Sequence, residues 1–384
     1  MDVSGFTRLL ARRLISGLTL SLLFAGMASA QARTVEPTYS EVKQWVVGCD
    51  NTRRCLARFV PSEFARPAAL RGREPGLMSV TREAGSAGGV TIRVGIAGRF
   101  DEDAREKTFF RLDPAQIQLD GQLLAPRLAP PARGGPLSEY RLSGSAALKF
   151  LTAVQGGSIL TLTARPDSPL VSLEGLTEAL VAMDRAQGRA NNQSALIHGG
   201  RAAPASAIPA APALPLVRAA PAHGTLPNAS TIAGQVRRAR ASDLRRHECD
   251  LARRDDQVER LNALEVIVVL SCNSGAYQGY ALAFRAPIAN PLAARIIRLP
   301  MPKFLGDAAD GDAAAEYGAG HYDPETATFS QTSLGRGIGD CGMGAEWVFD
   351  GRAFRLASLS YQDRCGGQPG DWMPLYRTRI LELD

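Results

Sequence analysis

Residues 347–356 read WVFDGRAFRL, and this stretch shows the fold class of the chain most clearly. Two short apolar runs, at 347–349 and 354–356, flank the pair Asp350-Gly351. Aspartate followed by glycine supplies the positive φ angles of a type I′ turn, which joins two antiparallel strands. The stretch therefore predicts a β-hairpin.

Strand patterns recur in the rest of the chain. Residues 90–97 alternate apolar with small or polar side chains, which is the period of a half-buried strand. Asp120-Gly121 again lies between short apolar runs and predicts a second hairpin. Further short strands are predicted at 159–163, 263–272 and 277–284.

Two helices are also predicted. The apolar side chains of residues 176–183 share one helical face, and Gly188 follows where that helix would end. Residues 232–254 are rich in Arg, Ala and Leu and predict a second helix. Strands and helices do not alternate as in a parallel sheet, so we expect a mainly β fold with a few helices, of the α+β class.

Length and composition divide the chain. It has 384 residues, whereas a domain typically has roughly 100–200. Fifteen of the twenty-two residues at 201–222 are Ala or Pro, a composition that breaks helices and strands alike. We therefore expect two β-rich domains, at 35–200 and 228–384, joined by an Ala/Pro-rich linker at 201–227.

The N-terminus has the pattern of a secretory signal peptide. Three arginines precede an apolar stretch at 14–26, and residues 28–30 read ASA, which matches the small-x-small cleavage pattern. We expect residues 1–30 to be removed, the mature chain to be periplasmic, and no transmembrane span to remain in it. Removal lowers the formal net charge from +6 to +4, because three Arg and one Asp are lost. This modest charge argues against a nucleic-acid partner.

An even number of cysteines in an exported chain favours disulfides. Six cysteines allow fifteen pairings. Sequence proximity favours Cys49–Cys55, Cys249–Cys272 and Cys341–Cys365. The alternative is a metal site or a reactive thiol, although the chain contains no C-x-x-C motif.

Three short motifs suggest chemistry, and each also has a structural explanation. Residues 337–342 match G-x-G-x-x-G, but they follow a turn-rich segment and precede a strand, so we expect a turn beside a disulfide. His247, Glu248 and Cys249 are adjacent, so their side chains point in different directions and do not easily share one metal. Cys341 could pair with His321 as a nucleophile and base only if Cys365 were left without its disulfide.

Acidic residues gather in a Gly/Ala-rich segment. They are Asp307, Asp310, Asp312, Glu316 and, further on, Asp323. Their spacing is not that of an EF-hand, so we expect a solvated loop, with weak calcium binding as the alternative. No G-x-S-x-G motif is present. We predict no catalytic, cofactor-binding or metal-binding residue, and leave open a carboxylate pair that the fold could bring together.

The densest run of charge lies at 237–254, with a net charge of +4. A solvated helix face is the simplest explanation. The alternative is a partner surface formed by Arg237, Arg238, Arg245 and Arg246, whose guanidinium groups would bind an anionic envelope polymer such as lipopolysaccharide.

Several segments form a recognisable combination. They include WVVGCDNTRRC at 45–55, LEGLTEALVAMDRAQG at 173–188, CNSGAY at 272–277, GDCG at 339–342, RCGG at 364–367, GDW at 370–372, and Tyr376-Arg377. Together they resemble the DUF1176 family of exported proteobacterial proteins. The resemblance implies an envelope protein with its cysteines paired within each half, and it transfers no catalytic residue. The N-terminal half is also similar to the invasion-associated locus B family, through its early W…C…C pattern and its strands.

These observations favour a non-enzymatic binding or interaction module of the cell envelope. Its partner would be an envelope protein or an anionic envelope polymer, and no cofactor is expected. Trp347, Trp372, Tyr376 and Arg377 would serve packing or a partner surface. One alternative is a periplasmic hydrolase that acts on envelope polymers through carboxylates. Another is an inhibitor of a foreign enzyme, which a rigid, disulfide-pinned loop projecting into solvent would indicate.

Overall fold

The computed structural model of the chain describes residues 35–65, 67–96, 99–101, 106–108, 112–124, 139–163, 168–197, 203–252, 255–305, 316–317 and 320–381. The predicted signal peptide lies outside these residues. Strands dominate the described residues, which contain four α-helices, so the mainly β prediction is confirmed. Single-turn 3-10 helices lie at Ala68–Leu70, Pro114–Gln116, Ala205–Ala207, Pro291–Ala293 and Lys303–Leu305.

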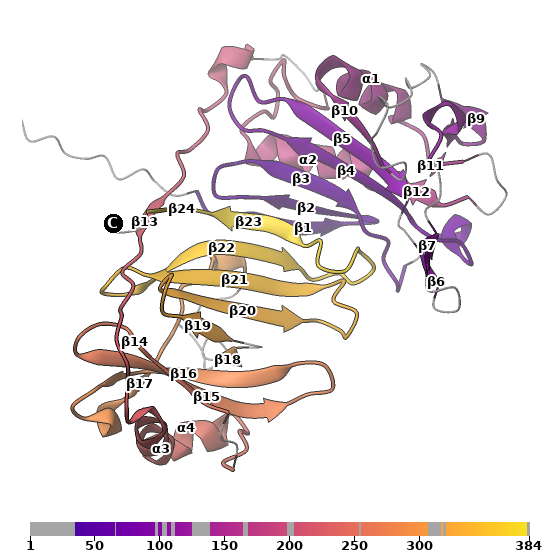
Figure 1. Cartoon of the computed structure of the whole chain (residues 1–384). Coiled ribbons are helices and arrows are strands. Elements are labelled where there is room, and N and C mark those ends of the chain that lie inside the picture. Colours follow the sequence, from indigo (N-terminus) through magenta and orange to yellow (C-terminus); the bar gives the residue numbers. More distant parts are fainter. Residues whose placement is uncertain are drawn as a thin grey trace, which may run out of the picture. The chain divides into compact units, whose positions relative to one another are not determined.

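The first half of the chain forms a six-stranded antiparallel sheet in the order β1-β2-β3-β4-β5-β10 (Figure 1). Its strands are β1 (Thr38–Val42), β2 (Trp45–Cys49), β3 (Cys55–Phe59), β4 (Gly76–Arg82), β5 (Val90–Ile96) and β10 (Glu139–Ser143). The helices α1 (Gly144–Val154) and α2 (Leu176–Ala186) share a core with one face of this sheet. In Figure 1, α2 lies behind the strands, so the opposite face of the sheet is turned toward the viewer.

A smaller sheet in the order β12-β11-β8-β9 completes this half. Its strands are β8 (Gln118–Leu119), β9 (Gln122–Leu123), β11 (Ile159–Thr161) and β12 (Leu170–Ser172), and a separate hairpin pairs β6 (Arg99–Asp101) with β7 (Glu106–Thr108). Asp120 and Gly121 join β8 to β9 with φ angles of 51° and 82°, as a type I′ turn requires. The predicted helix at α2 is also confirmed, because its apolar face is buried and Gly188 follows it with a φ of 70°.

The second half forms two antiparallel sheets (Figure 1). One contains β14 (Gln257–Arg260), β15 (Glu265–Ser274), β16 (Gly279–Pro287), β17 (Arg295–Ile296) and β18 (Glu316–Tyr317). The other contains β19 (His321–Asp323), β20 (Thr328–Leu334), β21 (Gly342–Phe349), β22 (Phe354–Gln362) and β23 (Met373–Arg377). The helices α3 (Ala229–Ala239) and α4 (Ala241–Arg246) share a core with β14, β15 and β16.

The hairpin predicted at 347–356 is present, but its turn is longer than a type I′ turn. The loop 350–353 joins β21 to β22, and within it Gly351 alone has a positive φ, of 90°. The Asp350 carboxylate accepts hydrogen bonds from the backbone N–H groups of Arg352 and Ala353 at 2.9 and 2.8 Å. This side-chain cap stabilises a four-residue loop. The Asp-Gly pair by itself predicted a shorter, two-residue turn.

The predicted helix at 232–254 was too long. The structure has two helices, α3 and α4, and the second ends at Arg246. Cys249 then leaves the helical path because its disulfide partner, Cys272, lies on β15.

The predicted linker also contains secondary structure. β13 (Leu216–Arg218) pairs in parallel with β24 (Arg379–Leu381). Val217 and Ala219 are buried against Val348 and Ala357. The strand forms because no proline interrupts residues 216–218, although Pro215 precedes them. The division into two domains at this segment stays a prediction.

β2 is buried along its whole length because a core covers each of its faces. Trp45 lies in the core of the first half, whereas Val46 lies in a second core that contains Met373 and Leu375 of β23. A side chain at Gly48 would bring its Cβ within 2.6 Å of Leu375. The two halves of the chain therefore share an apolar interface.

Candidate functional site

The six cysteines form three disulfides, Cys49–Cys55, Cys249–Cys272 and Cys341–Cys365, and none of the six is free. The pairing is the one that sequence proximity favoured. Asp340 lies beside the Cys341–Cys365 disulfide, and the three side chains lie close enough together to suggest metal ligands. Because both sulfur atoms are bonded to each other and Asp340 is bonded to Arg336, this cluster is structural.

The Cys49–Cys55 disulfide closes a loop that binds the end of β23. Asp50 in this loop accepts a hydrogen bond from Nε of Arg377 at 2.7 Å. Asn51 exchanges two hydrogen bonds with the backbone of Arg377, and the Thr52 hydroxyl accepts another from its guanidinium at 2.6 Å. The segment CDNTRRC and Arg377 therefore form one contact between the two halves.

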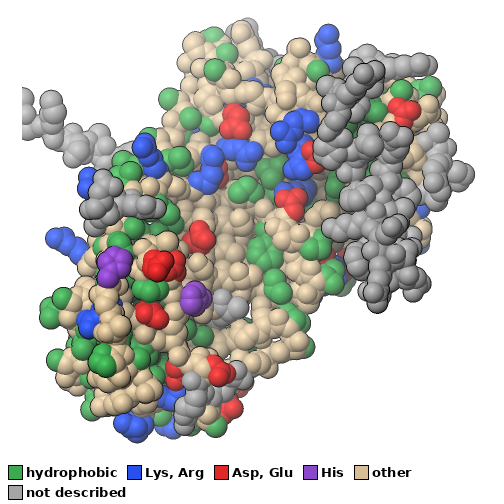
Figure 2. All heavy atoms as spheres, in the orientation of Figure 1, with side chains coloured by type: hydrophobic (Ala, Val, Ile, Leu, Met, Phe, Trp, Pro, Cys, Tyr) green, Lys and Arg blue, Asp and Glu red, His purple; other side chains and the backbone are tan. Residues whose placement is uncertain are grey.

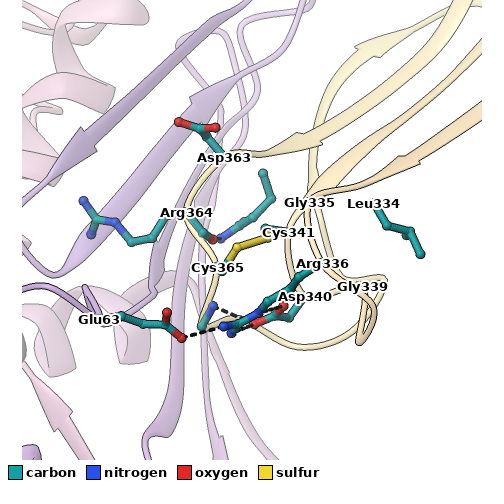
Figure 3. The surroundings of a disulfide bond; sticks show 12 residues. Glu63, Leu334, Gly335, Arg336, Gly339, Asp340, Cys341, Asp363, Arg364 and Cys365 are labelled. Atoms are coloured by element: carbon teal, nitrogen blue, oxygen red, sulfur yellow. Dashed lines mark hydrogen bonds and ion pairs between the residues drawn. A yellow bond between two sulfur atoms is a disulfide. The ribbon is translucent and has the colours of Figure 1, made fainter. Parts of the chain in front are cut away.

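The surroundings of the Cys341–Cys365 disulfide form a second contact (Figure 3). Arg336 is paired with both Asp340 and Glu63, and Glu63 belongs to the first half. Burial opposes ionisation of Asp340, but its bonds from Arg336 and from the N–H of Gly366 prevail and lower the pKa of its carboxyl. Arg364 reaches the Glu41 carboxylate and the Lys43 carbonyl.

The segment MDRAQGR forms a buried polar network. Gln187 donates to the carbonyls of Arg53 and Arg82, while Arg189, which is 0% exposed, donates to Gln187 and Ser194. Asp184 accepts from the N–H groups of Leu196 and Ile197, and burial raises the pKa of its carboxyl. These residues fix α2 against the sheet.

The glycine-rich motif at 337–342 forms a turn between β20 and β21, beside the disulfide, as expected. The indole N–H of Trp372 donates to the Gly339 carbonyl at 3.1 Å. Trp347 is buried, and its indole N–H donates to the Pro300 carbonyl at 2.8 Å. Both tryptophans serve packing.

The remaining candidate ligands form no metal-binding cluster within the part of the chain that the structure describes. Cys249 and Cys341 are each in a disulfide, so neither can act as a thiolate with His247 or His321. Asp323 caps a turn by accepting from Glu325 and Thr326. Asp307, Asp310 and Asp312 lie outside the described residues, and the side chain of Glu316 is not described either.

The predicted arginine surface needs one correction. Arg237 is 6% exposed, because it is paired with Asp256 and donates to the Ser271 carbonyl at 3.0 Å. Its guanidinium therefore lies in a buried ion pair and is not part of an exposed arginine surface. Arg238, Arg245 and Arg246 are exposed, and Arg246 lies 3.5 Å from Asp243.

The strongest candidate site is a cleft on the outer face of the six-stranded sheet, with a volume of about 210 Å³. Its floor comes from β3, β4, β5 and β10 of the first half, and its wall from the loop at 366–371 of the second half. Arg58, Ser79 and Arg93 stand in one row across the floor, because each faces the next across a strand pair. We name this region the sheet cleft. Figure 2 shows basic and acidic side chains gathered over these strands.

Charged pairs border the sheet cleft. Arg58 is bonded to the carboxylate of Asp371 at 2.9 Å and to its carbonyl, while Arg93 forms a two-pronged pair with Glu139. Burial lowers the pKa of the Arg58 guanidinium; Asp371 opposes the effect and nearby Arg93 adds to it. The bond to Glu139 chiefly raises the pKa of Arg93. The site therefore offers oriented guanidinium groups above a hydroxyl floor.

The sequence did not predict the sheet cleft, because more than 220 residues of chain separate its floor from its wall. The available signal was Arg93, an arginine at an outward position of the alternating strand at 90–97. A lone arginine on an outer face is ordinary, so only the wall at 366–371 makes this one notable.

Among the described residues, no helix combines the length and apolar character that crossing a bilayer would need. The three disulfides are consistent with an extracytoplasmic protein.

Comparisons with known proteins identify the family of the chain. No solved structure matches the chain. The chain is 28% identical over 364 residues to an uncharacterized protein of Escherichia coli (strain K12), YpfG, an alignment that covers 93% of this chain and 98% of that protein. The family model described as a protein of unknown function, DUF1176, matches residues 39–379, which include all six cysteines and the whole sheet cleft. The chain therefore belongs to the DUF1176 family.

Proposed function

We propose that the protein is a periplasmic binding module of the cell envelope, and that its ligand occupies the sheet cleft. One observation carries the proposal: the floor of the cleft belongs to the first half of the chain and its wall to the second. A ligand there would contact both halves, and binding sites are common at such junctions. The signal-peptide pattern and the disulfides support the location.

The chemistry of the sheet cleft favours binding over hydrolysis. Glu139 and Asp371 each form an ion pair with an arginine of the floor, which occupies their carboxylate oxygens. A general acid must instead keep its proton near neutral pH, usually through burial. Asp184 is a carboxyl with a raised pKa, but it lies in the buried network of α2. The hydrolase alternative is therefore less well supported.

Filling the sheet cleft tests the proposal. Ser79 and Leu77 line it from β4, and a tryptophan at either position would occupy most of the volume. Purified mature protein should co-sediment with an envelope fraction, either outer-membrane vesicles or cell-wall sacculi. Ser79→Trp and Leu77→Trp should each weaken that binding at least tenfold. The melting temperature of each variant checks that it is folded.

A control variant locates the binding. Arg238→Gln with Arg245→Gln removes two exposed charges from the helices of the second half and should leave binding unchanged. If this double variant loses binding while both tryptophan variants keep it, the ligand binds the arginine surface and the sheet cleft is not the site. If no envelope fraction binds native protein, the binding role itself fails.

A second candidate function is inhibition of another protein, and the loop at 61–65 favours it. Phe64 is 102% exposed at the tip of this loop. Gln44 holds the loop by accepting from Ser62 at 3.0 Å and donating to Ala65 at 2.9 Å. Glu63 ties it to Arg336, beside the Cys341–Cys365 disulfide (Figure 3). An anchored loop with an exposed aromatic tip resembles the hot spots of protein interfaces.

A photocrosslinking amino acid at position 64 tests this second function. If Phe64 anchors a protein partner, irradiation of the intact periplasm should give one discrete adduct. The same probe at Leu123, which is 47% exposed on β9, is the control. Equal adducts at both positions, or none at position 64, would argue against a docking role for Phe64.

A further inference from the structure

We propose that the sheet cleft binds an oxyanion, such as a phosphate ester or a carboxylate, between Arg58 and Arg93, and that Asp371 occupies part of this site until the ligand displaces it. The inference deepens the proposed function and rests on it. It names the chemical class of the ligand at that site.

The floor of the cleft presents two cations with a small side chain between them. Arg58 on β3 faces Ser79 on β4, which faces Arg93 on β5. Neighbouring strands lie about 4.8 Å apart, so the two arginine Cα atoms are separated by about 10 Å. Ser79 lines the cleft, and because its side chain is short it leaves the space between the two arginines open. An oxyanion placed there would lie between both guanidinium groups.

Each guanidinium keeps donors for such a ligand. It carries five N–H groups. The bonds from Arg58 to Asp371 use two of its nitrogens, and the bonds from Arg93 to Glu139 also use two. The side chain of Arg93 is 45% exposed, so it remains open to a ligand that enters from solvent. Guanidinium forks bind phosphate and carboxylate through paired hydrogen bonds.

The proximity of the two guanidinium groups is itself unfavourable. Arg58 is 11% exposed, and burial lowers the pKa of its guanidinium, with a further contribution from Arg93. An anion between two partly desolvated cations relieves both effects. The two guanidinium groups therefore offer hydrogen-bond donors to an anion, although the carboxylates of Glu74, Glu139 and Asp371 also line the cleft.

Asp371 supplies this anion in the unliganded protein. Its side chain is 48% exposed and belongs to the loop at 366–371, which contains Gly366, Gly367 and Gly370. Glu139, in contrast, is fixed on β10 and opposes Gly95 across the sheet. A ligand that takes the place of the Asp371 carboxylate on Arg58 keeps that guanidinium in an ion pair. Asp371 thus acts as an internal competitor.

Calorimetric titration with inorganic phosphate tests the inference. Arg93→Gln should weaken binding about tenfold, because it removes a charge-assisted hydrogen-bond donor. Asp371→Asn should strengthen it several-fold. The matched controls are Arg355→Gln, which removes an arginine from the Arg355–Asp350 pair of the second half, and Glu83→Gln, which removes a carboxylate from the Arg54–Glu83 pair. Neither control should change the affinity.

Two further arms identify the source of the anion. Glucose 6-phosphate probes a phosphate ester, and glucuronate probes a sugar carboxylate; whichever binds tighter than inorganic phosphate indicates the natural group. An affinity for phosphate that does not change in Arg93→Gln and does not rise in Asp371→Asn would overturn the inference.

The outcome separates this inference from the proposed function. Suppose that Ser79→Trp abolishes binding of the envelope fraction, while phosphate does not compete and Arg93→Gln binds normally. The sheet cleft is then a binding site for a ligand of another class. Envelope binding that survives Ser79→Trp contradicts the proposed function instead.

Discussion

Asp50 and Arg377 are 327 residues apart in sequence, and their Oδ2 and Nε atoms lie 2.7 Å apart in the structure. The Asp50 side chain is 1% exposed, whereas that of Arg377 is 44% exposed. The other oxygen of Asp50 accepts from the N–H groups of Thr52 and Arg54 within the first disulfide loop. One carboxylate thus organises that loop and attaches it to β23, which packs against β2. The loop at 366–371, which forms the wall of the sheet cleft, leads directly into β23. The position of the wall therefore depends on such contacts.

Replacing Asp50 should destabilise the whole protein. Asp50→Asn keeps the shape of the side chain but removes its charge, which weakens the bonds from both Arg377 and the loop. We expect the free energy of unfolding to fall by about 2 kcal/mol. Urea titration measures this loss. Arg355→Gln breaks the exposed pair with Asp350 and should cost less than about 1 kcal/mol. Equal losses of unfolding free energy in the two variants would show that the Asp50–Arg377 contact stabilises the protein no more than an exposed ion pair does.

The disulfides should differ in their contribution to stability. Cys249–Cys272 and Cys341–Cys365 join residues 23 and 24 apart, whereas Cys49–Cys55 joins residues 6 apart. On the chain-entropy model, removing either long-loop disulfide costs about 3 kcal/mol and removing the short one about 2 kcal/mol. Paired Cys→Ala variants measure this difference in urea. Peptide mapping without reduction should find no free thiol in native protein, and a free Cys249 or Cys341 would contradict the pairing.

Asp184 should make stability depend on pH. Its folded-state pKa is raised above the unfolded value of about 3.9. Such a group contributes stability below its unfolded pKa and loses that contribution as pH rises through its folded pKa. The native protein should therefore lose stability relative to Asp184→Asn as the pH rises above the unfolded pKa of about 3.9.

Asp340 provides a control of the opposite sign. The pKa of its carboxyl is lowered, so its contribution is present above the unfolded pKa and is lost as pH falls through the folded one. The native protein should gain stability relative to Asp340→Asn as pH rises over the acidic range. Urea titrations at several pH values give both differences. Parallel curves for the two variants would refute the assignment.

Gly121 should be required for its backbone conformation alone. It has a φ of 82°, and a Cβ built there meets nothing within 4 Å. Gly121→Ala should cost about 1 kcal/mol, because a residue with a Cβ is strained in this region. Gly89→Ala is the matched control, since its site is equally open and its φ is not in the left-handed region. If both variants were equally stable, the turn between β8 and β9 would not need a positive φ there.

Local patterns in the sequence predicted much of the secondary structure. The alternation in β5, the apolar face of α2 and the turn at Asp120-Gly121 depend on neighbouring residues, and all three are present. The segment WVVGC of β2 shows no alternation, because Trp45 and Val46 enter different cores. The turn at Asp350-Gly351 was wrong in length because a side-chain cap decided it.

The disulfides were predictable, whereas the candidate site was not. Proximity in sequence sufficed for Cys249–Cys272 and Cys341–Cys365, because the partners of each pair are only 23 and 24 residues apart. The pair Arg58–Asp371 depends on packing between the two halves, which no local pattern encodes. The burial of Arg237 beside Asp256 was not foreseen either, because it depends on how α3 packs against β14 and β15 within the second half.

Hydrogen exchange of the mature protein, with and without the envelope fraction that it binds, tests the central claim most directly. If the ligand occupies the sheet cleft, protection should appear in peptides that cover Arg58, residues 76–79, residues 93–96 and the loop at 366–371. Peptides of α3 and α4 should exchange as they do in free protein. Protection confined to α3 and α4, with none at the cleft, would contradict the account.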